Sequence, residues 1–307
     1  AIAVALLLET DQLAAKEAEH CGLIGELSLN GRIRPCSGIL SMASEARKQG
    51  IHTLILPLEN VPEAAAISGI EIVGVKTLQE TVRYLESGQM PEQTILPDAE
   101  RPRMQEAQLD FSDVKGQNDL VEAIVLGAAG GHNILMIGEP GCGKTMILPE
   151  MTERESLEVT KIHNIANLTA PEDGILKIRP FRAPHHNISL NALIGGGSYA
   201  EPGEVSLANH GVLFLDELAE FSRSTLDALR QPLEDKKVTI SRVNITNTYP
   251  ANFMLVAAMN PCPCGYYPSG KCRCTDYEIM HYRGRISGPI LERIDIQKNV
   301  RHVDYFN

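Results

Sequence analysis

The stretch Gly138-Glu139-Pro140-Gly141-Cys142-Gly143-Lys144-Thr145 decides the fold, and it directly follows the apolar run HNILMI at residues 132–137. It has the pattern G-x-x-x-x-G-K-T in the order of strand, loop and helix that this motif requires. The glycines let the backbone curl so that its N–H groups point at phosphate oxygens. In the motif, the lysine reaches the β- and γ-phosphates and the threonine hydroxyl ligates Mg²⁺. All eight residues are therefore predicted to bind ATP. A chance glycine loop is disfavoured because the strand precedes it.

Two further apolar runs end in polar side chains that suit nucleotide hydrolysis. The run GVLFL leads into Asp216 and Glu217, and the run FMLVAAM leads into Asn260. The carboxyl ends of parallel strands meet at one edge of a sheet, so these side chains should face the phosphates. Asp216 is expected to hold Mg²⁺, Glu217 to polarise the attacking water, and Asn260 to contact the γ-phosphate or that water. Taken alone, an Asp–Glu pair is usually a solvated helix start, and an asparagine before proline is usually a turn residue.

Length and composition indicate a globular protein of two domains. The chain has 307 residues, of which 43% are hydrophobic and 22% are charged. The apolar run Ala1–Leu8 is too short to cross a membrane and lacks the features of a signal peptide, so a cytoplasmic location without membrane contact is expected. The net charge of −11 argues against a whole-chain basic face for nucleic acid, but it leaves room for a few basic loop residues.

Four of the seven cysteines lie within thirteen residues, as Cys262, Cys264, Cys272 and Cys274. Four thiolates are the ligand set of a closed, structural Zn²⁺ site. The C-x-C spacing is tighter than the usual C-x-x-C, so free thiols in a reduced loop remain the alternative.

The chain divides by composition into three segments. Residues 1–88 alternate short apolar runs with helical stretches, which predicts α/β packing. Residues 89–112 are rich in Pro, Glu and Gln and are interpreted as a linker, and the nucleotide-binding pattern occupies 113–307. The elements expected in the first segment are strands at 24–29, 52–57 and 70–75 and helices at 41–49, 61–67 and 78–87.

Five segments of the third part resemble the magnesium-chelatase-like AAA+ family, and within it the ComM (YifB-like) branch. They are RPFRAPHH (179–186), GGGSYAEPGEVSLANHGVLFLDEL (195–218), LRQPLEDKKVTISR (229–242), AAMNPCPCGYY (257–267) and RISGPILERIDI (285–296). The resemblance runs from about residue 113 to 303. It implies a P-loop AAA+ core with a parallel sheet flanked by helices, a homo-oligomeric, hexameric ring, and branch migration of DNA during natural transformation. The family's helical lid would follow Asn307.

The same resemblance implies an arginine finger at Arg293, which would enter the neighbouring subunit's site and neutralise charge on the γ-phosphate. A surface arginine paired with Glu292 or Asp295 is the alternative, and Arg285 is a second candidate for the finger.

The first segment is similar to the proteolytic domain of Lon, through GELSLNGRIRPCSGIL (25–40), EARKQGIHTLILPLEN (45–60) and GIEIVGVKTLQETVRYL (69–85). Lon uses a serine–lysine dyad in which the lysine is the base. Counted from Pro35, the lysine's position holds Met42, and a thioether cannot take a proton. The segment with the serine would precede Ala1. The resemblance therefore implies a partial, catalytically inactive domain that serves as a scaffold.

Two groups of residues leave their roles open. His185 and His186 could contact a ligand, although such pairs are more often structural. Lys236, Lys237 and Arg242 flank an expected hairpin and either grip phosphates or belong to a solvated turn. The overall expectation is Mg²⁺-dependent ATP hydrolysis coupled to DNA remodelling. The alternatives are a chelatase motor that inserts metal into a tetrapyrrole and an ATP-gated scaffold with little turnover.

Overall fold

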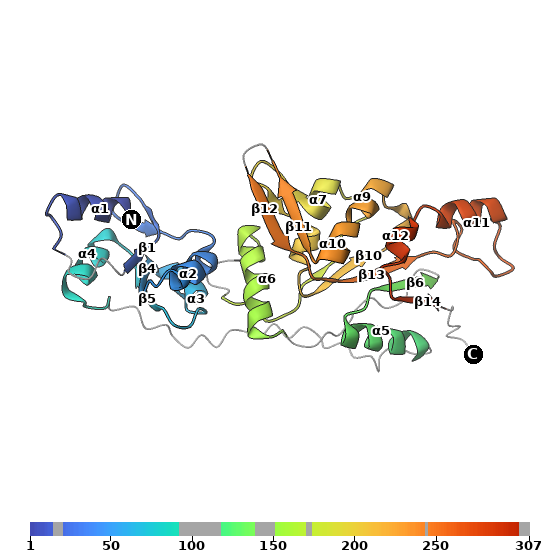
Figure 1. Cartoon of the computed structure of the whole chain (residues 1–307), viewed down its shortest axis with the longest axis horizontal. Coiled ribbons are helices and arrows are strands. Elements are labelled where there is room, and N and C mark those ends of the chain that lie inside the picture. Colours follow the sequence, from blue (N-terminus) through green and yellow to red (C-terminus); the bar gives the residue numbers. More distant parts are fainter. Residues whose placement is uncertain (15–20, 92–117, 139–150, 170–173, 243–244, 301–307) are drawn as a thin grey trace. The chain divides into compact units, whose positions relative to one another are not determined.

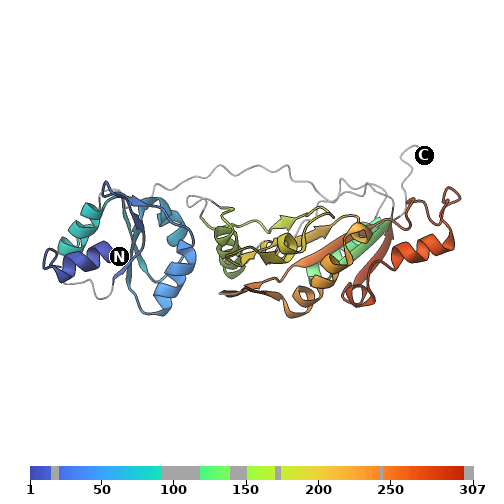
Figure 2. The same ribbon diagram turned by 90° about the horizontal axis from the view of Figure 1, so that it is seen from above.

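The computed structural model describes residues 1–14, 21–91, 118–138, 151–169, 174–242 and 245–300 (Figures 1 and 2). The chain forms two compact units. One contains Ala1–Met104 and His163–Leu176, and the other contains Gln105–Ile162 and Lys177–Asn307. The expected linker at 89–112 lies outside the described residues from position 92 onward, so its boundaries stay a prediction.

The first unit is built on a parallel sheet of three strands. Its order is β1 (Cys21–Leu23), β4 (Thr53–Pro57) and β5 (Glu71–Val75). Figure 1 shows α1 (Ile2–Glu9) and α4 (Leu78–Ser87) on one side of this sheet, with α2 (Ile39–Lys48) and α3 (Val61–Ala64) on the other. A short 3-10 helix, η2 (Leu58–Asn60), precedes α3, and the strands β2 (Glu26–Leu27) and β3 (Ile33–Arg34) form a small hairpin. The side of α1 and α4 is apolar, and Val4 and Leu85 pack there against Ile55 and Val75.

Local sequence signals explain most of these elements. The helix expected at 78–87 is confirmed: Thr77 caps its first turn by accepting a hydrogen bond from the Glu80 N–H at 3.2 Å, and Gly88 ends it in the left-handed region. The strand expected at 24–29 is wrong. The chain leaves the sheet after Leu23 and turns at Gly25, where a Cβ would lie 2.5 Å from Ile33, so the next residues pair back in the hairpin. The helix expected at 61–67 ends earlier, at Ala64.

The second unit contains the parallel sheet that the P-loop motif predicts, which confirms the α/β fold class. The strand order is β14 (Ile296–Val300), β6 (Ile134–Gly138), β13 (Met254–Met259), β10 (Val212–Leu215) and β7 (Phe181–Arg182), and every pairing is parallel. Figure 1 shows α5 (Asn118–Gly130) on one side of the sheet and α7 (Leu190–Ile194), α9 (Arg223–Ala228) and α10 (Arg230–Asp235) on the other. Each face has its own apolar cluster, with Leu120 and Ile124 in one and Leu193 and Leu226 in the other.

The remaining elements of this unit lie between or after the strands. They are the helices α6 (Glu153–Ile165), α8 (Glu204–Leu207), η5 (Leu218–Glu220), α11 (Asp276–Arg283) and α12 (Gly288–Leu291), and the hairpins β8 (Gly195–Gly196) with β9 (Glu201–Pro202) and β11 (Lys237–Ser241) with β12 (Thr246–Pro250). Figures 1 and 2 both show the β11–β12 hairpin and helix α11 at opposite ends of this unit. Among the described residues, every helix is too short or too polar to span a lipid bilayer.

One buried side chain joins three neighbouring strands at their amino ends. Asn133, which is 7% exposed, donates from its Nδ2 to the carbonyl of Arg293 at 2.8 Å, and its backbone N–H donates to Asp295 at 2.8 Å. Its Oδ1 accepts from the Leu255 N–H at 2.8 Å. These bonds align the starts of β6, β13 and β14, and they satisfy polar groups that would be costly to bury without partners.

Candidate functional site

The P-loop begins at the carboxyl end of β6. Gly138 is the last residue of that strand and pairs with Val300 of β14, whose carbonyl oxygen would lie 2.6 Å from a Cβ at this position. A side chain at residue 138 would therefore separate the two strands. The rest of the motif lies outside the described residues, and its predicted ligands are Glu139, Pro140, Gly141, Cys142, Gly143, Lys144 and Thr145.

Asp216 and Glu217 follow directly after β10, at the same edge of the sheet. The backbone N–H of Glu217 donates to the Asp216 carboxylate at 3.1 Å. Glu217 has a φ of +53°, in the left-handed region that non-glycine residues seldom adopt, and it precedes the 3-10 helix η5. Its side chain is 52% exposed. The carboxylate therefore follows an unusual backbone conformation at a sheet edge that solvent can reach.

His186 contacts Glu217, a pairing that the sequence reasoning missed. The Nδ1 atom of the imidazole lies 3.0 Å from Oε2 of the carboxylate. The His185 ring lies against His186 in a tilted arrangement, with ring centroids 4.1 Å apart and an interplanar angle of 35°, and Phe221 meets the His186 ring edge-on at 6.4 Å. The histidines lie in the loop after β7, and β7 pairs with β10. The contact between His186 and Glu217 could have been predicted only from the pairing of β7 with β10.

The arginines of the RPFRAPHH segment have structural contacts. Arg182 makes a two-pronged ion pair with Glu204 at the start of α8, with distances of 2.6 and 2.7 Å. The hydrogen-bonded Glu204 carboxylate raises the pKa of Arg182. Arg179 pairs with Glu155 at 3.2 Å and donates to the carbonyl of His210 at 2.6 Å. These two anchors fix the loop that presents His186 to Glu217.

Asn260 is the third polar residue at the carboxyl edge. It comes directly after Met259, which pairs with Ile137 of β6, so Asn260 lies level with the start of the P-loop. On the other side, Ala257 pairs with Leu215, the last residue of β10. The edge therefore brings together Gly138, Asn260, Asp216 and Glu217 from three adjacent strands. These are the described members of the predicted nucleotide site.

The two candidate finger arginines contact carboxylates of their own chain. Arg293 pairs with Glu234, and it donates to the carbonyl of Pro289 at 2.8 Å. Neither of the neighbours considered from the sequence is its partner, because Asp295 instead accepts from Asn133 and Glu292 is exposed. Arg285 pairs with Glu220 at 3.0 Å and donates to the carbonyl of Ala219 at 3.3 Å.

The predicted hairpin is present as β11 and β12, and its cations differ in their surroundings. Lys236 and Lys237 are exposed at its base, and Lys236 ends α10 with a φ of +55°. Arg242, next to the turn, donates to the carbonyl of Gly197 and to the side chain of Asn191, both at 3.3 Å. Arg242 therefore ties the hairpin to the segment that carries α7 and β8.

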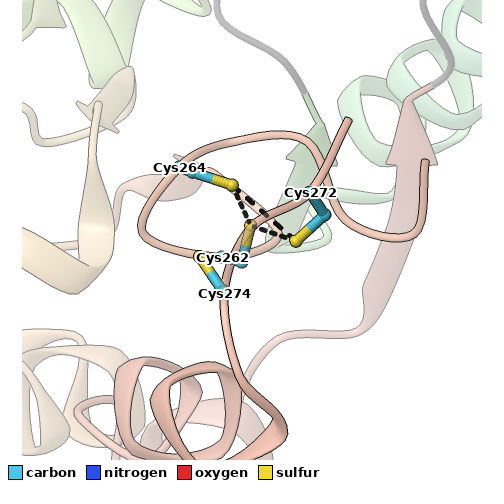
Figure 3. Close-up of side chains that lie close together, drawn as sticks. All are labelled: Cys262, Cys264, Cys272 and Cys274. Carbon is cyan, nitrogen blue, oxygen red and sulfur yellow. Dashed lines mark hydrogen bonds between the residues drawn. The ribbon is translucent and has the colours of Figure 1, made fainter. Parts of the chain in front are cut away.

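The four clustered cysteines converge in the loop between β13 and α11 (Figure 3). Their sulfur atoms all lie within 4.8 Å of one another. Cys262 is fully buried, whereas the other three are half-buried. The N–H groups of Arg273 and then Tyr266 lower the pKa of Cys264 to about 6. At that pKa the Cys264 thiol is largely ionised at neutral pH, and the thiolate is the form that binds metals.

Comparisons with known proteins identify the family of the chain. The family model described as "Magnesium chelatase, subunit ChlI" matches residues 110–307, and the model "Subunit ChlI of Mg-chelatase" matches residues 1–60. The "Uncharacterized protein YifB" of Escherichia coli is 42% identical over 306 residues, and the "Competence protein ComM" of Haemophilus influenzae is 40% identical over 308 residues. Each alignment covers 97% of this chain and 60% of the relative, so the chain spans only part of their length.

A further match concerns the first unit alone. "Lon protease 2" of Bacillus subtilis is 39% identical over 61 residues, which are 20% of this chain and 11% of that protein. The first ChlI model spans more than half of the chain. The chain therefore belongs to the magnesium-chelatase-like AAA+ family, in the branch of YifB and ComM, and carries a Lon protease-like segment before its AAA+ core.

Proposed function

We propose that the chain hydrolyses ATP with Mg²⁺ as a subunit of an AAA+ ring that remodels DNA. The observation that supports hydrolysis best is the meeting of Gly138, Asn260, Asp216 and Glu217 at the carboxyl edge of one parallel sheet. Ligands of open α/β sheets bind at that edge. A binding module could retain the P-loop alone, whereas a glutamate beside it provides a base for the attacking water.

Each residue has one task in the proposed reaction. The P-loop N–H groups and Lys144 hold the phosphates, and Thr145 and Asp216 hold the metal, which neutralises charge on the phosphoryl oxygens. Glu217 accepts a proton from the attacking water while Asn260 orients that water or the γ-phosphate. Arg293 of a neighbouring subunit completes the site. In the single chain Arg293 pairs with Glu234, so it must leave this partner when it reaches across an interface.

The DNA partner and the hexameric ring rest on the family and on the relative named "Competence protein ComM". The exposed Lys236 and Lys237 at the base of the β11–β12 hairpin are candidate phosphate contacts, and contacts of this kind position a protein on DNA without reading sequence. A cytoplasmic location is part of the proposal. The Lon-like unit serves as a scaffold, because Met42 stands at the position of the dyad lysine and cannot act as a base. A structural Zn²⁺ at the cysteine cluster is the third proposed cofactor.

Two alternatives differ in what stimulates turnover. A chelatase motor would respond to partner subunits and a tetrapyrrole, and an ATP-gated scaffold would turn over little under any condition. The deciding experiment measures phosphate release by the full-length protein with and without forked DNA, and with Glu217→Gln as the control. We expect DNA to stimulate the wild type and to leave the variant inactive. Stimulation by a tetrapyrrole system alone would favour the chelatase, and slow turnover in every condition would favour the scaffold.

A further inference from the structure

The distances between the clustered sulfur atoms match those of a four-thiolate metal site. The Sγ atom of Cys262 lies 3.4 Å from that of Cys264 and 3.8 Å from that of Cys272, and the last two are 3.7 Å apart. A tetrahedral zinc site with Zn–S bonds of ~2.3 Å has sulfur–sulfur edges of ~3.8 Å. Disulfide sulfurs would lie ~2.05 Å apart, so these contacts are not disulfides. Cys274 lies within the same 4.8 Å group.

The chemistry of the donors selects the metal. The group consists of thiols alone, without a carboxylate or an imidazole. Soft ligands in a tetrahedron favour Zn²⁺ and disfavour Mg²⁺ or Ca²⁺. Four protein ligands leave no open position for a water molecule, so the ion would be structural.

The loop that carries the cysteines has little else to hold it. Between Cys262 and Ile279 only Gly265 is buried, and Tyr266 and Lys271 face solvent. The backbone–backbone hydrogen bonds inside the loop close local turns, such as those from the Gly265 N–H to the Cys262 carbonyl at 3.0 Å and from the Cys272 N–H to the Ser269 carbonyl at 3.0 Å. The longer contacts are the hydrogen bond from the Arg273 N–H to the Cys264 sulfur and the Arg283 guanidinium over the Tyr267 ring, 5.1 Å from its centroid. A segment with so small a core needs a cross-link to keep one conformation, and a metal provides one.

The cluster lies between Asn260 of the proposed ATPase site and the start of helix α11. Cys262 comes two residues after Asn260, and Cys274 directly precedes Thr275, whose side chain forms a capping box with Glu278 at the start of α11. From the end of that helix, Arg283 donates to the carbonyl of Pro261 at 3.1 Å. A metal at the cluster would therefore close a loop whose two ends both support the chain immediately after Asn260.

We propose that Cys262, Cys264, Cys272 and Cys274 bind one structural Zn²⁺, and that this ion fixes Asn260 at the carboxyl edge of the sheet. The second half of this inference rests on the proposed function of Asn260 in ATP hydrolysis. Loss of the ion should leave ATP binding by the P-loop intact, because the P-loop motif follows β6 in the sequence whereas the cluster follows β13. It lowers the rate of hydrolysis, because the oriented Asn260 is lost.

Metal content tests the first half. Purified full-length protein, prepared without chelator, should contain about one zinc per chain, and X-ray absorption should show four sulfur neighbours at ~2.3 Å. Cys272→Ser should lose the zinc, whereas the matched control Cys36→Ser, outside the cluster, should retain it. Tetrahedral cobalt–thiolate absorption after exchange with Co²⁺ should follow the same pattern. The metal site would be refuted if the purified protein contains no zinc, takes up no Co²⁺ and has four thiols that all react rapidly with a thiol reagent.

Hydrogen exchange tests the second half without relying on activity. Removal of zinc should raise amide exchange at residues 259–276 and leave strands β4 and β5 unchanged. In parallel, Cys272→Ser should bind fluorescent ATP like Cys36→Ser and hydrolyse ATP about tenfold more slowly or worse. Unchanged amide exchange around Asn260, or full turnover by the zinc-free variant, would refute the proposal that the ion fixes Asn260. If the wild-type protein does not hydrolyse ATP, the proposed function is refuted. The zinc content and the hydrogen exchange around Asn260 would still test whether the ion binds and fixes that residue.

Discussion

His186 and Glu217 form a close contact, with Nδ1 of the imidazole 3.0 Å from Oε2 of the carboxylate. Glu217 is the proposed base, and its backbone already holds the left-handed conformation. His186 in turn contacts the tilted ring of His185 and the ring of Phe221. A base must point at its water to work, so we expect His186 to be a positioning residue for the proposed hydrolysis.

His186→Ala should lower the turnover number while ATP binding stays unchanged, because the carboxylate loses its positioning partner. We expect a loss of about tenfold or more, a fraction of the roughly 10²–10⁴-fold that a general base contributes. Steady-state phosphate release and nucleotide titration measure the two effects separately. His185→Ala, which removes only the ring beside His186, is the matched control and should cost less activity. In a Glu217→Gln background, His186→Ala should add no further loss, because both act on one group. Additive losses would contradict this role.

Lys144→Ala should abolish ATP binding. Lys144 is the only cation in the P-loop motif, and the charge of the β- and γ-phosphates then has no side-chain partner there. Titration with a fluorescent ATP analogue measures the affinity, and Thr145→Ala is a useful comparison because it should weaken binding mainly when Mg²⁺ is present. Unchanged affinity of Lys144→Ala would refute the assignment of the P-loop.

Arg293→Ala should act across subunits. Removal of an arginine finger from a related nucleotide hydrolase costs of order 10³-fold or more, whereas an exposed ion pair contributes about 1 kcal/mol or less to stability. Mixtures of Arg293→Ala and Glu217→Gln subunits, each inactive alone, should recover part of the activity. Such recovery is possible because one interface then combines an intact glutamate with an intact arginine.

The ion pair with Glu234 supplies the control for this experiment. Glu234→Gln removes the partner of Arg293 within the chain and leaves the arginine in place. If Arg293 serves only that pair, both substitutions should have the same small effect on stability and none on turnover. Full activity of Arg293→Ala would exclude the finger and direct attention to Arg285.

Glu204→Gln should destabilise the second unit by about 1–2 kcal/mol. The loss of one partner from a buried ion pair costs about 3–5 kcal/mol, but these side chains are 31% and 20% exposed, so solvent screens part of it. Urea unfolding measures the change as a lower midpoint with an unchanged slope. Glu201→Gln, at an exposed carboxylate nearby, should leave the midpoint within experimental error. A midpoint of Glu204→Gln equal to that of the wild type would show that Arg182 is held by other contacts.

The sequence predicted those parts of the site that depend on single segments. Each apolar run that ends in a polar residue became a strand with that residue at its tip, as for Asp216 and Asn260. The contact of His186 with Glu217 depends on which strand lies beside β10, and local patterns do not contain that information. The same reason explains Arg293: neighbours in sequence suggested Glu292 or Asp295, but the helix packing brings Glu234 to it. The strand at 24–29 was misplaced because an apolar run does not show where Gly25 turns.

The hydrogen bonds of Asn133 affect when its sheet can assemble during synthesis of the chain. β6 is the first strand of its sheet to leave the ribosome, yet Asn133 finds its partners 122 and 160 residues later in the chain. The strand that leads into the P-loop therefore waits, with both edges open, until β13 and β14 have been synthesised. Contacts so distant in sequence form slowly, and unpaired strand edges aggregate. A nascent chain that stalls before β14 should consequently be a client for chaperones and not a smaller working ATPase.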